Sequence, residues 1–134
     1  MDIRNAQLDD IPALARLDRH ISRQELESSV RLGRVYVAEK QGVFVGWLRY
    51  NLFWDNTPFM NLLYVLDSCR GKGFGSLMLK YWETWMKQAG YETVMTSTQS
   101  NECAQHFYNK LGYGAVGGFL LPGESYELIL AKKL

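Results

Sequence analysis

Arg70-Gly71-Lys72-Gly73-Phe74-Gly75-Ser76 joins an apolar, strand-like run at 60–66 to an amphipathic, helix-like run that begins at Phe74. Its glycines let the backbone turn tightly and approach a ligand, and the first turn of a helix has N–H groups without intrahelical acceptors. Those donors, the positive end of the helix dipole and the cations Arg70 and Lys72 favour a polyanion such as a phosphate. A glycine-rich turn that only starts a helix is the alternative interpretation.

Length and composition narrow the possible classes of protein. A chain of 134 residues can bury one core but not two, so we expect a single domain over residues 1–134. The net charge is +1 with both signs interspersed, which excludes a broad cationic face for nucleic acid or anionic lipid. The longest uncharged run, 111–123, is shorter than a membrane span, and the N-terminus lacks the apolar core of a signal peptide. We therefore expect a cytoplasmic protein with no nucleic-acid or membrane partner.

Two cysteines, Cys69 and Cys103, are too few and too far apart for a disulfide framework or a zinc cluster. We expect both to be reduced thiols, and we expect no metal site.

The first half of the chain combines turn signals with apolar alternation, which predicts two helices among several strands. Pro12 is tolerated in a first helical turn, and Ser22 begins a Ser-x-x-Glu capping box. The expected elements are a strand at 3–5, helices from Asp9 or Asp10 to 17 and from 22 to 32, strands at 35–39 and 43–53, a turn at 55–58 and a strand at 59–66.

The second half predicts a long helix from Phe74 that ends near Gly90, because its apolar residues recur at steps of three and four. Its expected apolar stripe is Phe74, Leu77, Met78, Tyr81, Trp82 and Trp85. A strand at 91–96 after this helix argues for a right-handed crossover between parallel strands. A helix at 101–111 and antiparallel strands at 113–121 and 125–131 complete a mixed α/β sheet of six or seven strands with about four helices.

Two motifs carry a family resemblance. Arg70-x-x-Gly73-x-Gly75 matches the Gln/Arg-x-x-Gly-x-Gly/Ala signature of the GNAT superfamily, the Gcn5-related N-acetyltransferases. Asn101-x-x-Ala104-x-x-Phe107-Tyr108-x-x-x-Gly112-Tyr113 is similar to the second motif of that family. The motifs stand in the family's order, separated by one helix and one strand, and the resemblance covers essentially the whole chain. The chain thus resembles a small single-domain GNAT protein and is expected to have that acyl-CoA N-acyltransferase fold.

The resemblance implies an N-acetyltransferase that moves the acetyl group of acetyl-CoA to a primary amine of a small molecule or peptide by direct attack. Backbone atoms of Leu63 and Val65 would pair with the pantetheine arm, amides at 71–76 would hold the pyrophosphate, and Asn101 would contact the arm. A helix N-cap is the alternative role for Asn101. The cofactor-binding residues expected from the resemblance are Leu63, Tyr64, Val65, Arg70, Gly71, Lys72, Gly73, Phe74, Gly75, Ser76, Asn101 and Tyr108.

Two catalytic groups are expected, and the resemblance places the first of them, Tyr108, near the sulfur of coenzyme A. Tyr108 would donate a proton to the departing thiolate, and an ordinary tyrosine is protonated at neutral pH. The N–H of Val65 would polarise the thioester carbonyl. Alternatively, Tyr108 is a core residue, because it shares a helical stripe with Phe107 and Leu111.

The general base has no clear candidate, because 59–62 and 94–98 contain no carboxylate. Two kinds of base are left as alternatives. One is a carboxylate from the turn or the closing strands, namely Asp55, Glu124 or Glu127, and the other is a water chain along Asn61, Thr96 and Ser97. We expect His106 to be exposed. His20 either lines the acceptor site or, as we favour, is a surface residue.

Relatives usually build the acceptor pocket from regions that correspond here to 19–32 and 54–59. Four aromatic residues lie in or near these regions: Trp47, Tyr50, Trp54 and Phe59. They either form an aromatic wall that binds an amine or fill the core, and we favour the core for Trp47.

Two other functions compete with the acetyltransferase. A dinucleotide-binding oxidoreductase fits poorly, because Ser76 stands where Gly-x-Gly-x-x-Gly requires a glycine. A non-catalytic acyl-CoA sensor or interaction module remains possible without a carboxylate base. A homodimer through the closing strands is also possible.

Overall fold

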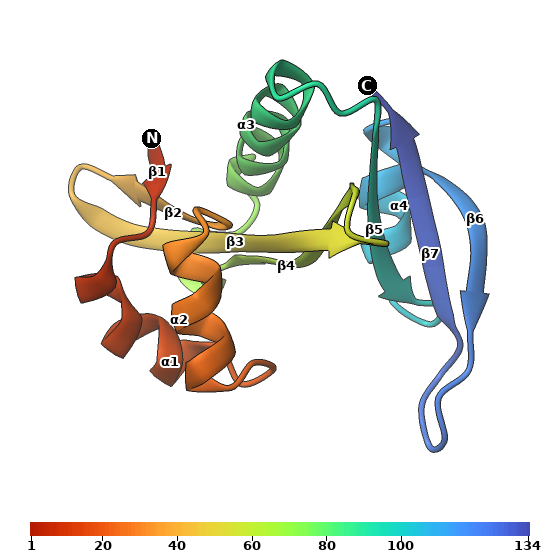
Figure 1. The fold of residues 1–134 in the computed structure, drawn as a ribbon, viewed down its shortest axis with the longest axis horizontal. Helices are drawn as coiled ribbons and strands as arrows, with labels where there is room; N and C mark the ends of the chain where they lie inside the picture. Colours follow the sequence, from red (N-terminus) through yellow and green to blue (C-terminus); the bar gives the residue numbers. More distant parts are fainter. The chain divides into compact units, whose positions relative to one another are not determined.

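The computed structural model describes residues 1–134 and contains one mixed sheet with four α-helices (Figure 1). The strand order is β1-β2-β3-β4-β5-β7-β6. The expected α/β sheet of six or seven strands with about four helices is therefore confirmed. The elements are β1 (Asp2–Asn5), α1 (Ile11–Leu17), α2 (Arg23–Arg31), β2 (Val35–Lys40), β3 (Val43–Phe53), β4 (Thr57–Val65), α3 (Phe74–Gln88), β5 (Thr93–Gln99), α4 (Ala104–Lys110), β6 (Gly114–Phe119) and β7 (Glu127–Lys133), with short 3-10 turns η1 (Leu8–Asp10) and η2 (Asp67–Cys69).

The chain divides into two compact units. The first consists of residues 1–51 and 62–81, and the second of residues 52–61 and 82–134. Three regular elements, β3, β4 and α3, pass from one unit into the other.

The first unit contains the antiparallel strands β1, β2 and β3, with α1 and α2 beside them (Figure 1). Gln41 and Gly42 both have positive φ, 52° and 76°, and form the tight two-residue turn of the β2–β3 hairpin. Apolar side chains from α1, α2 and one face of the strands form the core of this unit: Ala6, Ile11, Leu14, Leu26, Val30, Val35, Val37 and Trp47. Ser22 caps α2, accepting the N–H of Glu25 at 3.1 Å.

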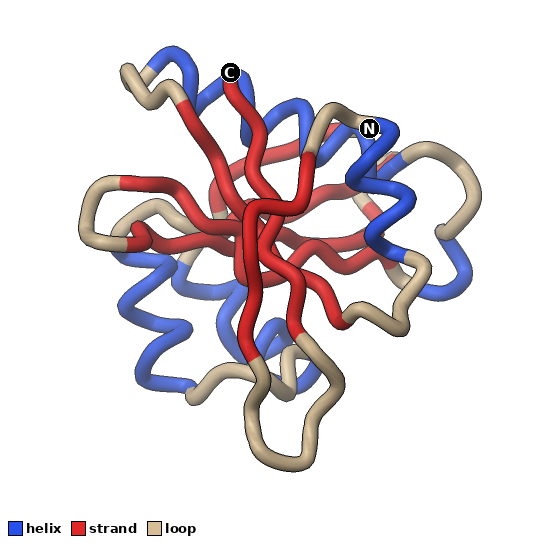
Figure 2. Tube along the Cα trace, turned by 90° about the vertical axis from the view of Figure 1, so that its right-hand side faces the viewer, coloured by secondary structure: helices blue, strands red, loops and turns tan.

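The second unit is built on β5, which pairs antiparallel with β7 over seven residues from Thr93↔Lys133 to Gln99↔Glu127. The parallel pairing of β4 with β5 is short and consists of Phe59↔Met95 and Met60↔Thr96. This parallel pair agrees with the expected crossover. β6 pairs antiparallel with β7, and the loop that joins them projects beyond the strands (Figures 1 and 2).

The buried stripe of α3 differs from the expected one. Phe74, Met78, Trp82 and Met86 are buried at steps of four, and Leu79 is buried beside them. Leu77 and Trp85, which the sequence placed on the stripe, are 52% and 50% exposed. Both three- and four-residue steps fit a helical period, so the sequence alone left the direction of the stripe open.

Several boundaries also differ. β5 begins at Thr93, not at Tyr91, because the N–H groups of Gly90 and Tyr91 close the end of α3 on Lys87 O and Met86 O in a Schellman motif. The turn before β4 is centred on Trp54 and Asp55, which have positive φ of 54° and 65°. The turn therefore lies earlier in the chain than the predicted 55–58, since Thr57 already begins β4.

The start of α4 is later than expected. This helix begins at Ala104 with Cys103 at the N-cap position, so the alternative role of Asn101 as N-cap is wrong. At α1, Asp10 occupies the N-cap position, but its carboxylate accepts from the Gln7 N–H at 2.7 Å and from Arg4, not from the helix. Both cysteines are free. None of the helices has both the length and the apolar character that crossing a bilayer requires.

Candidate functional site

The glycine loop leads from η2 into α3 within the first unit. Gly71 and Gly73 have φ of 76° and 80°, a region that favours glycine, and an added Cβ at either would meet no atom within 4 Å. The first helical hydrogen bond of α3 runs from the Leu77 N–H to Gly73 O at 3.2 Å. The N–H groups of Phe74, Gly75 and Ser76 therefore lack helical acceptors. Together these features make an open cradle at the positive end of a 15-residue helix.

Arg70 ties this loop to the end of β4. Its Nε donates to Val65 O at 3.0 Å, and its guanidinium lies over the Tyr64 ring, 5.0 Å from the centroid. It also pairs with Asp67 at 3.2 Å, but both side chains are more than half exposed, so this pair stabilises little. The sequence had identified Arg70 only as a cation for phosphate, whereas the structure also gives it a local contact that orients the loop.

The backbone of β4 alternates between its two edges. The Leu66 N–H donates to Val45 O at 2.9 Å, so this residue faces β3. Tyr64 O also faces β3, because it would clash with a Cβ on Gly46. Strand backbone groups alternate in direction, which turns the N–H and C=O groups of Leu63 and Val65 toward the opposite edge. These are the two residues whose backbone the resemblance assigned to the pantetheine arm.

Tyr108 lies on α4 in the second unit and is 8% exposed. Its ring packs edge-on against Phe107 and Tyr113, with centroids 5.1 and 5.7 Å away. Its hydroxyl is hydrogen-bonded to Thr96, whose own hydroxyl donates to Met60 O at 2.9 Å. The phenol is thus packed as a core side chain and is also held by a polar partner.

Burial raises the pKa of Tyr108 to about 12, and the nearby charge of Glu102 acts in the same direction, while the Thr96 hydrogen bond opposes them. The phenol is therefore protonated at neutral pH. A proton donor with this pKa is weaker than an ordinary tyrosine, because its conjugate phenolate is desolvated.

Glu83, Tyr113 and Lys132 form a part-buried polar cluster in the same unit. Glu83 accepts from the Tyr113 hydroxyl at 2.7 Å and from Lys132 Nζ at 2.9 Å. Its side chain is 12% exposed. Burial and the Glu83 carboxylate both raise the pKa of Tyr113. The sequence does not mark this cluster, because a charged residue within an amphipathic helix is usually solvated.

The other polar candidates are distributed over the second unit. Asn101 is exposed in the turn before α4, and His106 is exposed as expected. The Glu124 carboxylate accepts from Gln99 Nε2 at 3.0 Å in an exposed contact. Thr98 has a buried hydroxyl with no hydrogen-bond partner.

A pocket of about 300 Å³ opens within the first unit. It is lined by the end of α1, the residues that follow it and side chains of β3 and β4: Leu17, Asp18, Arg19, His20, Trp47, Leu62, Tyr64 and Leu66. His20 thus lines a pocket while remaining exposed. The expected acceptor segment 19–32 contributes only its first two residues.

Asp18 closes one side of this pocket and is 3% exposed. Burial alone would raise the pKa of Asp18, but hydrogen bonds from Arg49 and Trp47 outweigh burial and hold it below its usual value. Arg49 donates to both carboxylate oxygens, at 2.7 and 3.2 Å, and Trp47 Nε1 donates at 3.1 Å. No local pattern in the sequence marks this network.

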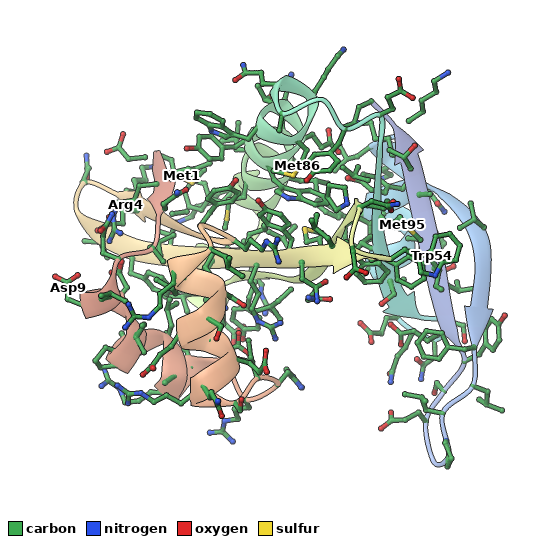
Figure 3. All side chains as sticks on the ribbon, viewed as in Figure 1. Met1, Arg4, Asp9, Trp54, Met86 and Met95 are labelled. Atoms are coloured by element: carbon green, nitrogen blue, oxygen red, sulfur yellow. The ribbon has the colours of Figure 1, made fainter.

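Two of the four aromatic residues proposed for a wall or the core, Trp47 and Tyr50, are buried and pack on different neighbours within the first unit. Trp47 is 2% exposed and packs on Phe44 and Tyr64, which confirms its favoured role in the core. Tyr50 instead packs on Tyr36, which in turn contacts Tyr81 of α3. Trp54, labelled in Figure 3, is 79% exposed in the second unit, where it contacts Phe53.

Comparison with known proteins identifies the family. Residues 2–113 match the Acetyltransferase (GNAT) family. The chain is similar to an uncharacterized N-acetyltransferase of Methanocaldococcus jannaschii, with 30% identity over 99% of the chain and 92% of the relative.

Solved structures show the same fold. Ard1 from Thermoplasma volcanium has a TM-score of 0.86 at 17% identity, covering 99% of this chain and 97% of that one. A PaiA N-acetyltransferase from Thermoplasma acidophilum, solved in complex with coenzyme A, has a TM-score of 0.74 at 18% identity, with 99% and 98% covered. The expected GNAT fold is confirmed, and the chain belongs to the GNAT family of N-acetyltransferases.

Proposed function

We propose that residues 1–134 act as one domain that transfers the acetyl group of acetyl-CoA to a primary amine of a small molecule or peptide. The observation that carries this proposal is the open cradle formed by Gly71, Gly73 and the N-terminus of α3. An anionic pyrophosphate matches its unpaired N–H groups and its dipole. The family membership and the coenzyme A complex of a structural neighbour support the same assignment.

The residues of the first unit fit such a ligand. Backbone groups of Leu63 and Val65 face away from β3 and can bond an extended pantetheine arm as a neighbouring strand would. Lys72 supplies an exposed cation beside the cradle, and Arg70 fixes the loop against Val65. Asn101 is a further proposed contact to the arm.

Acetyl-CoA would supply an activated acetyl thioester. The amine lone pair forms the new C–N bond as the C–S bond breaks, and the sulfur takes the bonding electrons and a proton. In this proposal the Val65 N–H donates to the thioester oxygen, on which negative charge develops. Tyr108 donates the proton to sulfur. A thiol has a pKa near 8.5, so proton transfer from a phenol at about 12 is uphill and occurs only once the sulfur carries most of its charge. The phenolate then regains the proton that the amine releases to water.

The acceptor amine must lose a proton before or during attack. We propose no carboxylate as the general base. The polar groups of β5 near Met60 are hydroxyls, and the Thr96 hydroxyl already donates its proton to Met60 O. Water is the proposed proton acceptor. A second candidate function is an acyl-CoA sensor without turnover. The hydrogen bond between the Tyr108 hydroxyl and Thr96 favours it, because it engages the phenol that the transferase needs as proton donor.

Thermal unfolding with added ligand tests the binding proposal. At 100 times its dissociation constant, a ligand of the native state adds about 2.7 kcal/mol, and we expect acetyl-CoA to do so while NAD and ATP do much less. Gly73→Ala should abolish this stabilisation, because φ of 80° strains alanine in the cradle. Gly90→Ala, with φ of 97° at the other end of α3, is the matched control and should keep it.

An equal response to the three ligands would contradict the proposal. Release of coenzyme A thiol with a panel of amines then separates the two candidates: turnover supports the transferase, and tight binding without turnover supports the sensor.

A further inference from the structure

We infer that the pocket of the first unit receives an apolar side chain attached beside the attacking amine. The acceptor class is then a primary amine that carries a group of leucine, methionine or phenylalanine size, such as the α-amine of an apolar amino acid or peptide. This inference rests on the proposed function and specifies its acceptor.

The lining of the pocket supports this class. Five of its residues present apolar or aromatic surface: Leu17, Trp47, Leu62, Tyr64 and Leu66. Leu17 is 44% exposed, so it adds accessible apolar surface to this lining. A volume of about 300 Å³ lies at the small end of ligand pockets, which suits one side chain better than an oligosaccharide.

The only carboxylate in the lining is already neutralised. Asp18 Oδ2 accepts from Arg49 Nε and Trp47 Nε1, and Oδ1 accepts from Arg49 Nη2 and the His20 N–H. Arg49 is 7% exposed, so this ion pair is buried and its charges cancel locally. A cationic tail would find no free acceptor here, and Arg19 in the lining would repel it. Polyamines and aminoglycosides are therefore disfavoured.

The pocket adjoins the atom proposed to hold the thioester oxygen. Tyr64 and Leu66, which line it, are the chain neighbours of Val65, and consecutive Cα atoms lie 3.8 Å apart. The Tyr64 ring contacts the Trp47 ring, with centroids 5.0 Å apart, and the Arg70 guanidinium, 5.0 Å from its centroid. An apolar group bound against this ring would hold its attached amine beside β4 with little reorganisation.

A series of amino-acid amides tests the inference: glycinamide, alaninamide, leucinamide, phenylalaninamide and lysinamide, with spermidine as a polycation. We expect kcat/KM for leucinamide to exceed that for glycinamide by at least about tenfold, since one methylene in an apolar pocket contributes about 10–200-fold. Leu17→Glu should remove this preference. The matched control is Leu32→Glu, because Leu32 is 62% exposed in the same unit and outside the pocket.

A second readout does not depend on turnover. In ¹H–¹⁵N spectra of the full chain, leucinamide should shift the indole N–H signal of Trp47, assigned with Trp47→Phe, and should leave that of Trp85 unchanged. Glycinamide and spermidine should have little effect. If acetyl-CoA fails to stabilise the protein, the proposed function fails, while the Trp47 signal still decides whether the pocket binds apolar amines.

Three outcomes would overturn the inference. The first is a Trp47 signal that leucinamide does not shift, and the second is a preference for spermidine over leucinamide. The third is the absence of selectivity among the amides together with a preference for butyryl-CoA over acetyl-CoA that Leu17→Glu removes. The last outcome would assign the pocket to a longer acyl chain.

Discussion

Replacing Asp18 with asparagine should strongly destabilise the protein. The substitution keeps the shape of the side chain and removes the charge that faces Arg49. Arg49 is 7% exposed and donates to both Asp18 oxygens, so its guanidinium would be left buried without a counter-charge. Removing one partner of a buried ion pair typically costs about 3–5 kcal/mol.

The expected change in melting temperature follows from chain size. Unfolding entropy near 2.1 cal/mol/K per residue gives about 0.28 kcal/mol/K for this chain, so Asp18→Asn should lower Tm by roughly 10–18 °C. Urea unfolding at pH 7 should show the same loss as a lower midpoint. Glu27→Gln is the control, because the Arg23–Glu27 pair spans 3.5 Å between exposed side chains and should contribute less than about 1 kcal/mol.

The difference between the wild type and Asp18→Asn should depend on pH. The pKa of Asp18 is lowered in the folded state, so its stabilisation is present above the ordinary value of 3.8 and is lost as pH falls through the lower folded pKa. We expect the same difference at pH 7 and pH 5, and a smaller one below about pH 4.

A loss below about 1 kcal/mol at pH 7 would refute the argument that Asp18 and Arg49 depend on each other. Asp18→Leu combined with Arg49→Met provides a further test. Removing both charges should recover part of the stability lost in Asp18→Asn, because no charge is left buried. No recovery would show that the Asp18 hydrogen bonds to Trp47 and His20, not the charge pair, carry the effect.

Three further predictions concern other residues. Tyr108→Phe should lower kcat by about 10²–10⁴-fold with acetyl-CoA affinity nearly unchanged, measured by thiol release and calorimetry; unchanged turnover would remove the phenol from catalysis. Gly46→Ala should destabilise the protein in thermal unfolding, because the new Cβ meets Tyr64 O, whereas Gly114→Ala meets no atom within 4 Å and should be nearly neutral. Glu83→Gln should cost about 1.5–3 kcal/mol in urea unfolding, since two donors lose a charged acceptor; a neutral result would contradict the assigned contacts.

Local signals in the sequence predicted much of the fold. The glycines at 71 and 73 need a left-handed backbone, and the apolar steps that follow begin a helix at Phe74, as the structure has it. Ser22 and Gly90 mark helix ends through short-range hydrogen bonds. Such features depend on neighbours within a few residues, so they can be identified without any tertiary information.

Long-range contacts explain what the sequence left out. Asp18 meets Trp47 and Arg49 across separations of 29 and 31 residues, and no local pattern marks such a meeting. Asp18 stands between Leu17 and Arg19, where a charged residue is ordinarily solvated. The pocket was therefore missed even though His20 had been considered for the acceptor site. The proposed roles of Tyr108, Val65 and Asn101 remain predictions.

The passage of β3, β4 and α3 between the two units has a practical consequence for protein engineering. The first unit takes its residues from two separate stretches of chain, and so does the second. No single backbone cut can release either unit whole, and grafting one onto another scaffold would sever strands and a helix in their interiors. Gene fusion or recombination would therefore have to carry the chain intact.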